Sequence, residues 1–359
     1  MKKIGILTGG GDCPGLNAVI RAVVRKSLRN KWVTIGIRNG WKGLVEGDIF
    51  PLTGRHVSGI LTKGGTILGT SRTNPFKNEE DTKKLLENVK TFGIDAVVAI
   101  GGEDTLGVAL KLHQRGIPVV GVPKTIDNDL SGTDFTFGFD TAVSIVTEAI
   151  DRLHTTAESH HRVIVVEVMG RHAGWIATTA GIAGGADQIL IPEQPFDIDE
   201  ICDSLKKRYD SGKTFSIVVV SEGAKPKELD TVVTQDQEKD DFGHVKLGGI
   251  GHWLGKEIEK RLGFETRVTV LGHVQRGGTP TAYDRVLATR FGIAATELIQ
   301  HDNYGKMVAL QGNKIVPVEL EGAVSTLKTV DMDLYKIAEV FFEDTESKPV
   351  LTVEDKTLP

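Results

Sequence analysis

The sequence predicts a doubly wound α/β fold made of two lobes, each built on a parallel sheet, with the active site in the cleft between them. Short, almost continuously apolar runs alternate with amphipathic helical stretches, which is typical of parallel strands covered by helices on both faces. The length of 359 residues exceeds what one hydrophobic core usually supports and favours two domains. Adjacent glycines also follow several expected strands, where such sheets bind ligands.

The first unit consists of a strand, a glycine turn and a helix. Residues 4–8 form the strand in this interpretation, and residues 14–29 form the helix. Pro14 suits the first helical turn, and apolar side chains recur along the helix on one face. Further strands are expected at residues 33–37, 96–100, 119–122, 163–168, 189–191, 216–221 and 268–271.

A second series of strands and helices begins after Phe139 and indicates where the lobes divide. The first lobe is expected to contain residues 1–138 and about 280–325. The second is expected to contain residues 139–279.

Two segments lie outside this pattern. Residues 225–244 are interpreted as a surface insertion, with a charge-dense stretch at 235–241 that forms a solvated loop or helix face. Residues 326–359 form an acidic C-terminal tail without a motif, and we expect no catalytic role for it.

The composition excludes several classes of protein. Hydrophobic residues make up 40% of the chain and charged residues 25%, which rules out collagen, disordered chains and disulfide scaffolds. A net charge of −5 gives no reason to expect nucleic acid or an acidic membrane as a partner. Two cysteines, Cys13 and Cys202, suit a reducing compartment, and no run reaches the roughly 18 apolar residues of a membrane span. A cytoplasmic protein is therefore expected.

A glycine turn after the first strand predicts a phosphate cradle. Residues 9–15 read Gly-Gly-Gly-Asp-Cys-Pro-Gly and offer bare backbone amides beside a helix N-terminus, which favours anions. The turn matches neither the dinucleotide-binding pattern nor the P-loop. A tight turn without a ligand is the structural alternative. Packing of a small residue explains Cys13 better than a nucleophile does.

Two acidic residues begin the helix that follows residues 96–100. Glu103 and Asp104 come after two glycines, in a first turn where the helix dipole favours negative charge. Helix capping thus explains both carboxylates without a ligand. Beside a phosphate site, a carboxylate here could instead bind Mg²⁺, which prefers oxygen ligands and phosphate partners.

The most informative segment follows residues 119–122. It places Lys124, Thr125, Asp127 and Asp129 at the end of a strand. In an extended segment the last three side chains would project together, and one carboxylate could act as general base on a substrate hydroxyl. Turn formation is the structural alternative, but it gives no role to Lys124.

Polar residues also occur at the ends of strands expected later in the chain. Arg171 follows residues 163–168, where a guanidinium group can stabilise a transferring phosphoryl group. Five further polar residues lie near the ends of expected strands: Arg162, Glu222, Arg267, His273 and Arg276. Each alone also suits an exposed surface. Together they fit a phosphorylated sugar, because guanidinium groups bind phosphate with forked geometry. With the cradle and the carboxylates, they predict phosphoryl transfer.

These segments together resemble the 6-phosphofructokinase family, from residue 4 to about residue 311. The resemblance depends on Gly-Gly-Gly-Asp-Cys-Pro-Gly-Leu-Asn-Ala from residue 9, Gly-Gly-Glu-Asp-Thr from 101, Thr-Ile-Asp-Asn-Asp from 125, Val-Glu-Val-Met-Gly-Arg from 166 and Val-Leu-Gly-His-Val-Gln-Arg-Gly-Gly from 270. It implies two Rossmann-like lobes, the first binding the phosphoryl donor and the second fructose 6-phosphate.

The resemblance also implies roles for individual residues. Asp127 would take the proton of the sugar 1-hydroxyl, Asp129 would support that site, and Glu103 would hold Mg²⁺. The groups expected to stabilise or face the phosphates are Gly11, Arg72, Thr125 and Arg171. Those expected to contact fructose 6-phosphate are Met169, Gly170, Glu222, His273 and Arg276.

A homodimer or a homotetramer is expected for the same reason. In this family, the residues corresponding to Arg162 and Arg267 reach the sugar phosphate of a neighbouring subunit. Arg21 and Arg25 resemble effector-binding residues of regulated members, although a solvated helix face explains them too. His154 and Phe215 replace further basic residues of such a site, so weak or absent allostery is expected.

Two departures from the ATP-dependent pattern favour pyrophosphate as the donor. ATP-dependent members generally carry glycine where this chain has Asp104 and Lys124. Asp104 would repel the nucleotide α-phosphate, and Lys124 would stabilise pyrophosphate. Since Lys124 also occurs in some ATP-dependent members, Asp104 carries more of this inference. The alternatives are an ATP-dependent enzyme and, more remotely, a non-catalytic sugar-binding protein, which Asp127 disfavours.

Overall fold

The computed structural model describes residues 1–228, 234–239 and 245–342, which pack into two compact units. Among these residues, unit 1 contains 1–145, 236–239, 245–246 and 273–329, and unit 2 contains 146–228, 234–235, 247–272 and 330–342. The chain first leaves unit 1 after Ile145, and its last segment in unit 1 begins at His273. The divisions expected from the sequence are at 138 and about 280.

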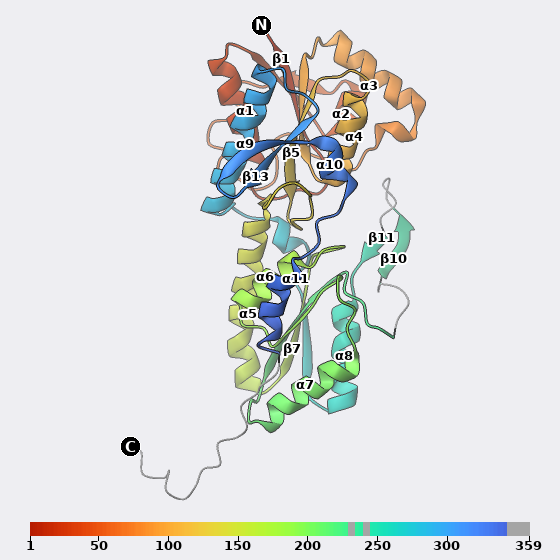
Figure 1. Cartoon of the computed structure of the whole chain (residues 1–359), viewed down its shortest axis with the longest axis vertical. Helices are drawn as coiled ribbons and strands as arrows, with labels where there is room; N and C mark the ends of the chain where they lie inside the picture. Colours follow the sequence, from red (N-terminus) through yellow and green to blue (C-terminus); the bar gives the residue numbers. More distant parts are fainter. Residues whose placement is uncertain (229–233, 240–244, 343–359) are drawn as a thin grey trace, which may run out of the picture. The chain divides into compact units, whose positions relative to one another are not determined.

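In the described part of the chain, unit 1 has an eight-stranded sheet (Figure 1). β2, β1, β4, β5 and β13 are parallel neighbours, β3 and β14 are antiparallel edge strands, and β6 pairs with β5. Thr8 of β1 lies beside Ile100 of β4, which lies beside Val122 of β5, so the three strands end at one edge. The strands are β1 Lys3–Thr8, β2 Val33–Ile37, β3 Ile49–Pro51, β4 Ala96–Gly101, β5 Val119–Thr125, β6 Phe137–Gly138, β13 Lys306–Gln311 and β14 Lys314–Glu319.

Helices cover both faces of this sheet (Figure 1). α1 and α9 lie on one face, and they pack so closely that a Cβ at Gly292 would lie 2.7 Å from Ala22 Cβ. On the other face, α2, α3 and α4 bury apolar side chains such as Trp41, Leu85 and Leu112 against the strands. The helices are α1 Leu16–Arg29, α2 Trp41–Glu46, α3 Glu79–Thr91, α4 Glu103–His113, α9 Ala282–Gln300 and α10 Leu320–Ser325.

Unit 2 is built on a parallel sheet with the strand order β12-β7-β9-β8. α7 and α8 contribute to its apolar core. α11 forms the start of the C-terminal tail and packs on α6, and Tyr335 donates a 2.7 Å hydrogen bond to Ile189 O. The elements are β7 Val163–Val168, β8 Gln188–Leu190, β9 Ser216–Ser221, β12 Thr266–Val270, α5 Phe139–His160, which begins in unit 1, α6 Trp175–Ala183, α7 Ile198–Asp210, α8 Ile250–Leu262 and α11 Met332–Glu339.

The predicted α/β fold class and all eight predicted strands are confirmed. The first helix begins at Leu16, two residues later than expected, because Gly15 takes a left-handed conformation with φ 107°. No described helix is long and apolar enough to span a membrane.

The expectation of a loop or helix face at residues 235–241 is wrong for its described part. Residues 234–239 form strand β10 (Thr234–Lys239), which pairs with β11 (Val245–Leu247). A continuously polar segment can form a strand when a second strand pairs with it, and charge density alone does not show this. Asp240 and Asp241 lie outside the described residues.

Candidate active site

The glycine turn after β1 is held by backbone hydrogen bonds to two other segments. Gly9 N donates to Ile100 O of β4 at 3.0 Å, and Gly10 N donates to Ser71 O at 3.1 Å. Thr70 Oγ1 donates to Gly10 O at 2.5 Å, and Gly10 has φ 76°. The turn is therefore fixed in a conformation that favours glycine. Arg72 directly follows this contact and is exposed.

Thr105 explains why two glycine runs meet here. A Cβ at Gly9 would lie 2.5 Å from Thr105 Oγ1, and a Cβ at Gly101 would lie 2.3 Å from Thr105 Cβ. The threonine is buried, and Trp41 Nε1 donates to its carbonyl oxygen at 3.3 Å. Sequence reasoning did not single out Thr105, because the need for small neighbours shows only in space.

Lys124 places a buried cation beside this turn. Its Nζ donates to Gly11 O at 2.5 Å, and a Cβ at Gly10 would lie 3.5 Å from the same nitrogen. Burial lowers the pKa of Lys124, and the nearby Arg276 guanidinium lowers it further. The sequence prediction that Lys124 belongs with the cradle agrees with this geometry.

Arg276 supplies a second cation to the same turn. It ends the 3₁₀ turn Gly272–Arg276, and its Nη1 donates to Asp12 O at 3.3 Å. A Cβ at Gly11 would lie 2.6 Å from this nitrogen, so the guanidinium group rests on the backbone of the cradle. His273, in the same 3₁₀ turn, is exposed.

The acidic residues Glu103 and Asp104 form the first turn of α4, as predicted. Glu103 is exposed and Asp104 is partly buried. A Cβ at the preceding Gly102 would lie 3.5 Å from Lys124 O, so this helix N-terminus lies beside the end of β5. The geometry is compatible with helix capping and with binding of a cation beside phosphate.

The segment after β5 bends. The expectation that Thr125, Asp127 and Asp129 lie in an extended segment and project together for that reason is therefore wrong. Thr125 Oγ1 accepts a hydrogen bond from Asp127 N at 3.0 Å, and Asn128 is left-handed with φ 51°. Asn128 is held by Thr136 N, which donates to its Oδ1 at 3.0 Å. Burial nevertheless alternates, since Thr125, Asp127 and Asp129 are partly exposed and the residues between them are buried.

Unit 2 brings Arg171 and Glu222 to the carboxyl ends of neighbouring strands. Gly170 has φ 134°, and its carbonyl oxygen accepts from Ser221 Oγ at 2.6 Å and from Gly223 N at 3.2 Å. The loop from Met169 to Arg171 is therefore tied to the end of β9, next to Glu222.

A glutamate that the sequence did not single out anchors the same loop at its other side. Both oxygens of Glu193 accept from Gly174 N at 3.0 Å, and Oε1 also accepts from Val330 N at 2.8 Å. Glu193 follows strand β8, so its position at a strand end is the only signal that could have identified it.

Arg162 and Arg267 lie at the opposite ends of the unit 2 strands. Arg162 precedes β7 and Arg267 is the second residue of β12. Both form ion pairs with Glu265, at 2.7 Å for Arg162 Nη2, and the hydrogen bond from Arg162 lowers the pKa of Glu265. Since β7 is six residues long, roughly 20 Å separates its two ends. The structure therefore does not bring these arginines together with Arg171 within one chain.

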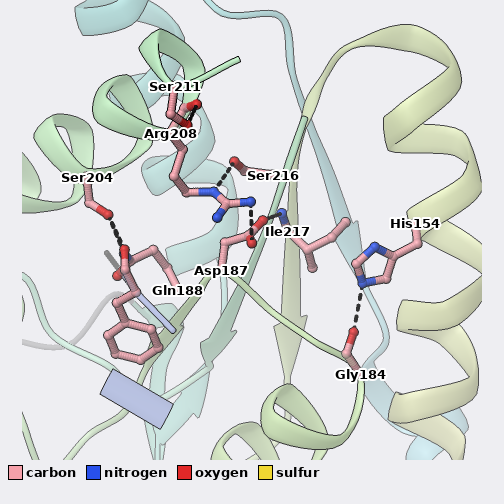
Figure 2. Close-up of polar contacts among 10 residues, drawn as sticks. His154, Gly184, Asp187, Gln188, Ser204, Arg208, Ser211, Ser216 and Ile217 are labelled. Atoms are coloured by element: carbon pink, nitrogen blue, oxygen red, sulfur yellow. Dashed lines mark hydrogen bonds and ion pairs between the residues drawn. The ribbon is translucent and has the colours of Figure 1, made fainter. Parts of the chain in front are cut away.

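His154, which takes the place of a basic effector residue, contacts its own unit (Figure 2). His154 Nε2 lies 2.7 Å from Gly184 O, at the end of α6, and its ring meets Phe215 edge-on. Nearby, Asp187 and Arg208 form a 2.7 Å ion pair, and burial raises the pKa of Asp187 although Arg208 opposes the shift. Weak or absent allostery stays a prediction.

Cys13 is fully buried, and burial raises the pKa of its thiol above the ordinary range. A Cβ at Gly138 would lie 2.7 Å from its sulfur. These contacts fit the expected packing role and disfavour a nucleophile.

Known proteins resemble this chain over most of its length. A family model described as phosphofructokinase matches residues 3–299. The chain is 59% identical to the pyrophosphate–fructose 6-phosphate 1-phosphotransferase of Streptomyces coelicolor, over 95% of this chain and 99% of that protein. It is 54% identical to ATP-dependent 6-phosphofructokinase 3 of the same organism, over 94% and 99% of the two chains.

Solved structures show the same fold. Pichia pastoris phosphofructokinase in the T-state matches with a TM-score of 0.81 and 32% identity, over 95% of this chain but only 37% of that longer one. The pyrophosphate-dependent phosphofructokinase of Nitrosospira multiformis matches with a TM-score of 0.81 and 24% identity, over 100% of this chain and 95% of that one.

Proposed function

The chain belongs to the phosphofructokinase family, and on this premise we propose that it transfers a phosphoryl group from pyrophosphate to the 1-hydroxyl of fructose 6-phosphate. The observation that carries phosphoryl transfer is the buried Lys124 ammonium bound to Gly11 in the glycine turn, whereas Asp104 in the first turn of α4 carries more of the choice of pyrophosphate as donor. A fixed cation there offsets donor charge without any contact to a nucleoside. Relatives at 59–60% identity named as pyrophosphate-dependent enzymes support the same donor.

Asp127 is the general base of this proposal. It would accept the proton of the 1-hydroxyl while that oxygen bonds to the terminal phosphorus, and the bridging P–O bond would break with its electron pair leaving on inorganic phosphate. The hydrogen bond from Asp127 N to Thr125 Oγ1 holds the backbone at this position. Asp129 would support the site from the same bent segment. We expect a reversible reaction that serves glycolysis or gluconeogenesis.

The charge of the transferring group would be stabilised by several donors. Lys124 and the backbone of Gly11 would act from unit 1, and Arg171 would act from unit 2. Each fixed donor of this kind lowers a barrier by about 3 kcal/mol. Thr125 would add a hydroxyl, and the exposed Arg72 would contact the donor phosphates.

Mg²⁺ would be held by Glu103 together with phosphate oxygens. No group of three or more acidic, histidine or cysteine side chains suited to a metal occurs among the residues that the structure describes, and Glu103 is the one side chain that we assign to the ion. That arrangement fits Mg²⁺, which usually takes one or two carboxylates plus substrate phosphates and water. The ion would neutralise charge on the donor.

Fructose 6-phosphate would be bound by residues at the ends of unit 2 strands and by residues of the 3₁₀ turn Gly272–Arg276. Its contacts in one chain would be Met169, Gly170, Glu222, His273 and Arg276. Arg162 and Arg267 would serve the site of a neighbouring subunit, and the length of β7 between Arg162 and Arg171 supports this assignment. The enzyme would therefore be a homodimer or homotetramer. We expect it to act in the cytoplasm.

ATP dependence is the second candidate, because relatives at 52–54% identity are named ATP-dependent 6-phosphofructokinases. Asp104 distinguishes the two. Its side chain belongs to the first turn of α4, which lies beside the end of β5. A carboxylate there would repel a nucleotide α-phosphate.

A donor assay tests the proposal. Formation of fructose 1,6-bisphosphate would be measured with Mg²⁺ and either pyrophosphate or ATP, with EDTA as the metal-free control. We expect turnover with pyrophosphate that EDTA abolishes. Faster turnover with ATP would overturn the donor assignment, and no product with either donor would overturn the function.

A further inference from the structure

Asp284 is a fully buried carboxylate of unit 1 that the proposed chemistry does not use. It lies in the first turn of α9, and its Oδ2 accepts hydrogen bonds from Thr141 N at 2.9 Å and Thr141 Oγ1 at 2.5 Å. Thr141 is the third residue of α5. A single carboxylate therefore lies at the N-terminal turns of two helices, where both helix dipoles favour negative charge.

Thr281 connects the same two turns. It caps α9, accepting from Asp284 N at 3.2 Å through Oγ1, and the same hydroxyl donates to Asp140 Oδ2 at 2.6 Å. Its backbone amide donates to Thr141 Oγ1 at 3.0 Å. Four residues of α5 and α9 thus form one continuous hydrogen-bond network.

This network is close in sequence to two residues that contact the glycine turn, Arg276 and Gly138. Arg276 lies five residues before Thr281 and rests on the backbone of Gly11. On the other side, Gly138 directly precedes α5, and a Cβ there would lie 2.7 Å from Cys13 Sγ. Displacing the junction of α5 and α9 would therefore move the segment that carries Arg276 and the packing beneath the turn.

The charge on Asp284 does not favour folding at neutral pH. Burial raises its pKa to about 6, although the hydrogen bonds from Thr141 act against this. The ionisable groups that face it are Asp140 on α5, Cys13 in the turn and Tyr283 on α9. Because the unfolded carboxylate releases its proton at lower pH, ionisation weakens folding between about pH 4 and pH 6.

We propose that Asp284 is a positioning residue, whose carboxyl oxygen holds the first turns of α5 and α9 together through its hydrogen bonds to Thr141 and so keeps Arg276 on the glycine turn. The kinetic part of this inference rests on the proposed function. Hydrogen exchange of the free protein tests it without any substrate.

Asp284→Ala is the informative variant, because it removes both hydrogen bonds to Thr141. Asp284→Asn is the rescue variant, because its amide oxygen can still accept them. The ratio of each variant's kcat/KM for fructose 6-phosphate to that of the wild type would be measured, and we expect at least a tenfold loss in Asp284→Ala and recovery of most of it in Asp284→Asn. Asp197→Ala, which alters the N-terminal cap of α7, should give a ratio near one.

Hydrogen exchange measured by mass spectrometry provides the second readout. Amides of residues 139–143 and 276–284 should exchange faster in Asp284→Ala than in the wild type at the same pH, and close to the wild-type rate in Asp284→Asn. Equal exchange in Asp284→Ala and the wild type, or equal kinetic losses in the two variants, would overturn the inference. If neither the wild type nor the variants turn over substrate, the proposed function fails while exchange still decides the role of Asp284.

Discussion

Lys124 donates a 2.5 Å hydrogen bond from its buried ammonium group to the carbonyl oxygen of Gly11. The contact fixes a positive charge to the backbone of the glycine turn. Such a cation costs free energy in the empty protein, since burial lowers the pKa of Lys124, and a bound anion would offset that cost.

Lys124→Met should therefore separate activity from stability. We expect kcat with pyrophosphate to fall about 10²- to 10³-fold, as for loss of one fixed donor, while the unfolding midpoint in urea stays equal or rises. Steady-state kinetics and denaturation of the same preparation check both. Lys314→Met, on an exposed edge strand, is the control, and an undiminished kcat in Lys124→Met would contradict the assigned role.

Asp104→Gly should open the site to ATP. Removing one like charge near the α-phosphate is worth about 1.4 kcal/mol or more, so kcat/KM for ATP should rise about tenfold or more, and Lys124→Gly combined with it should favour ATP further. Glu79→Gly removes a comparable carboxylate from the first turn of α3 and should leave donor preference unchanged. If ATP is used no better by Asp104→Gly, the exclusion argument is wrong.

Asp127→Asn should abolish most turnover while leaving binding intact. Loss of a general base lowers kcat by about 10²- to 10⁴-fold, and KM for fructose 6-phosphate should change little because the side chain keeps its size. Asp134→Asn is a suitable control, since its Oδ2 accepts a hydrogen bond from Gly312 N within unit 1 and it has no role in the proposed chemistry. Normal turnover by Asp127→Asn would exclude this residue as the base.

The fold could be predicted largely because buried parallel strands leave continuous apolar runs, as at residues 163–168. β14 shows where this fails: each of its residues is exposed or half-buried, and it contains Pro317. An edge strand needs only one partner, so its sequence carries a weaker signal.

The candidate site was predictable wherever chemistry follows a strand end directly. Asp127 and Arg171 are of this kind. Glu265, which pairs with Arg162, and Thr105, which requires glycine at two distant positions, were not, because each acts through a contact between segments that the sequence does not connect.

Stability should depend on pH through Asp284. Its carboxyl has a pKa of about 6 in the folded protein and 3.8 as the reference value, so the folded state binds more protons between these values and stability falls as pH rises through them. The difference in unfolding free energy between wild type and Asp284→Asn should therefore drop by about 3 kcal/mol from pH 4 to pH 7. Urea denaturation at each pH measures it, and a constant difference would contradict the raised pKa.

The contacts of Thr105 predict that Thr105→Ala restores the stability lost in Gly9→Ala but not that lost in Gly101→Ala. Gly9→Ala should lower the unfolding free energy by about 1–3 kcal/mol through overpacking, because its new Cβ would meet Thr105 Oγ1 at 2.5 Å and Cγ2 at 2.8 Å. Adding Thr105→Ala removes both atoms and leaves only Cβ, at 3.2 Å, so the second change should recover most of the loss.

Gly101→Ala should not recover in the same way, because its Cβ would lie 2.3 Å from Thr105 Cβ itself, which alanine retains. Gly107→Ala is the matched control: nothing lies within 4 Å of its Cβ position in α4, so it should stabilise the protein by up to about 1 kcal/mol through helix propensity. Denaturation of the two single variants and the two doubles checks this pattern. Equal rescue of both glycine variants by Thr105→Ala would contradict the finding that Gly9 and Gly101 approach different atoms of Thr105.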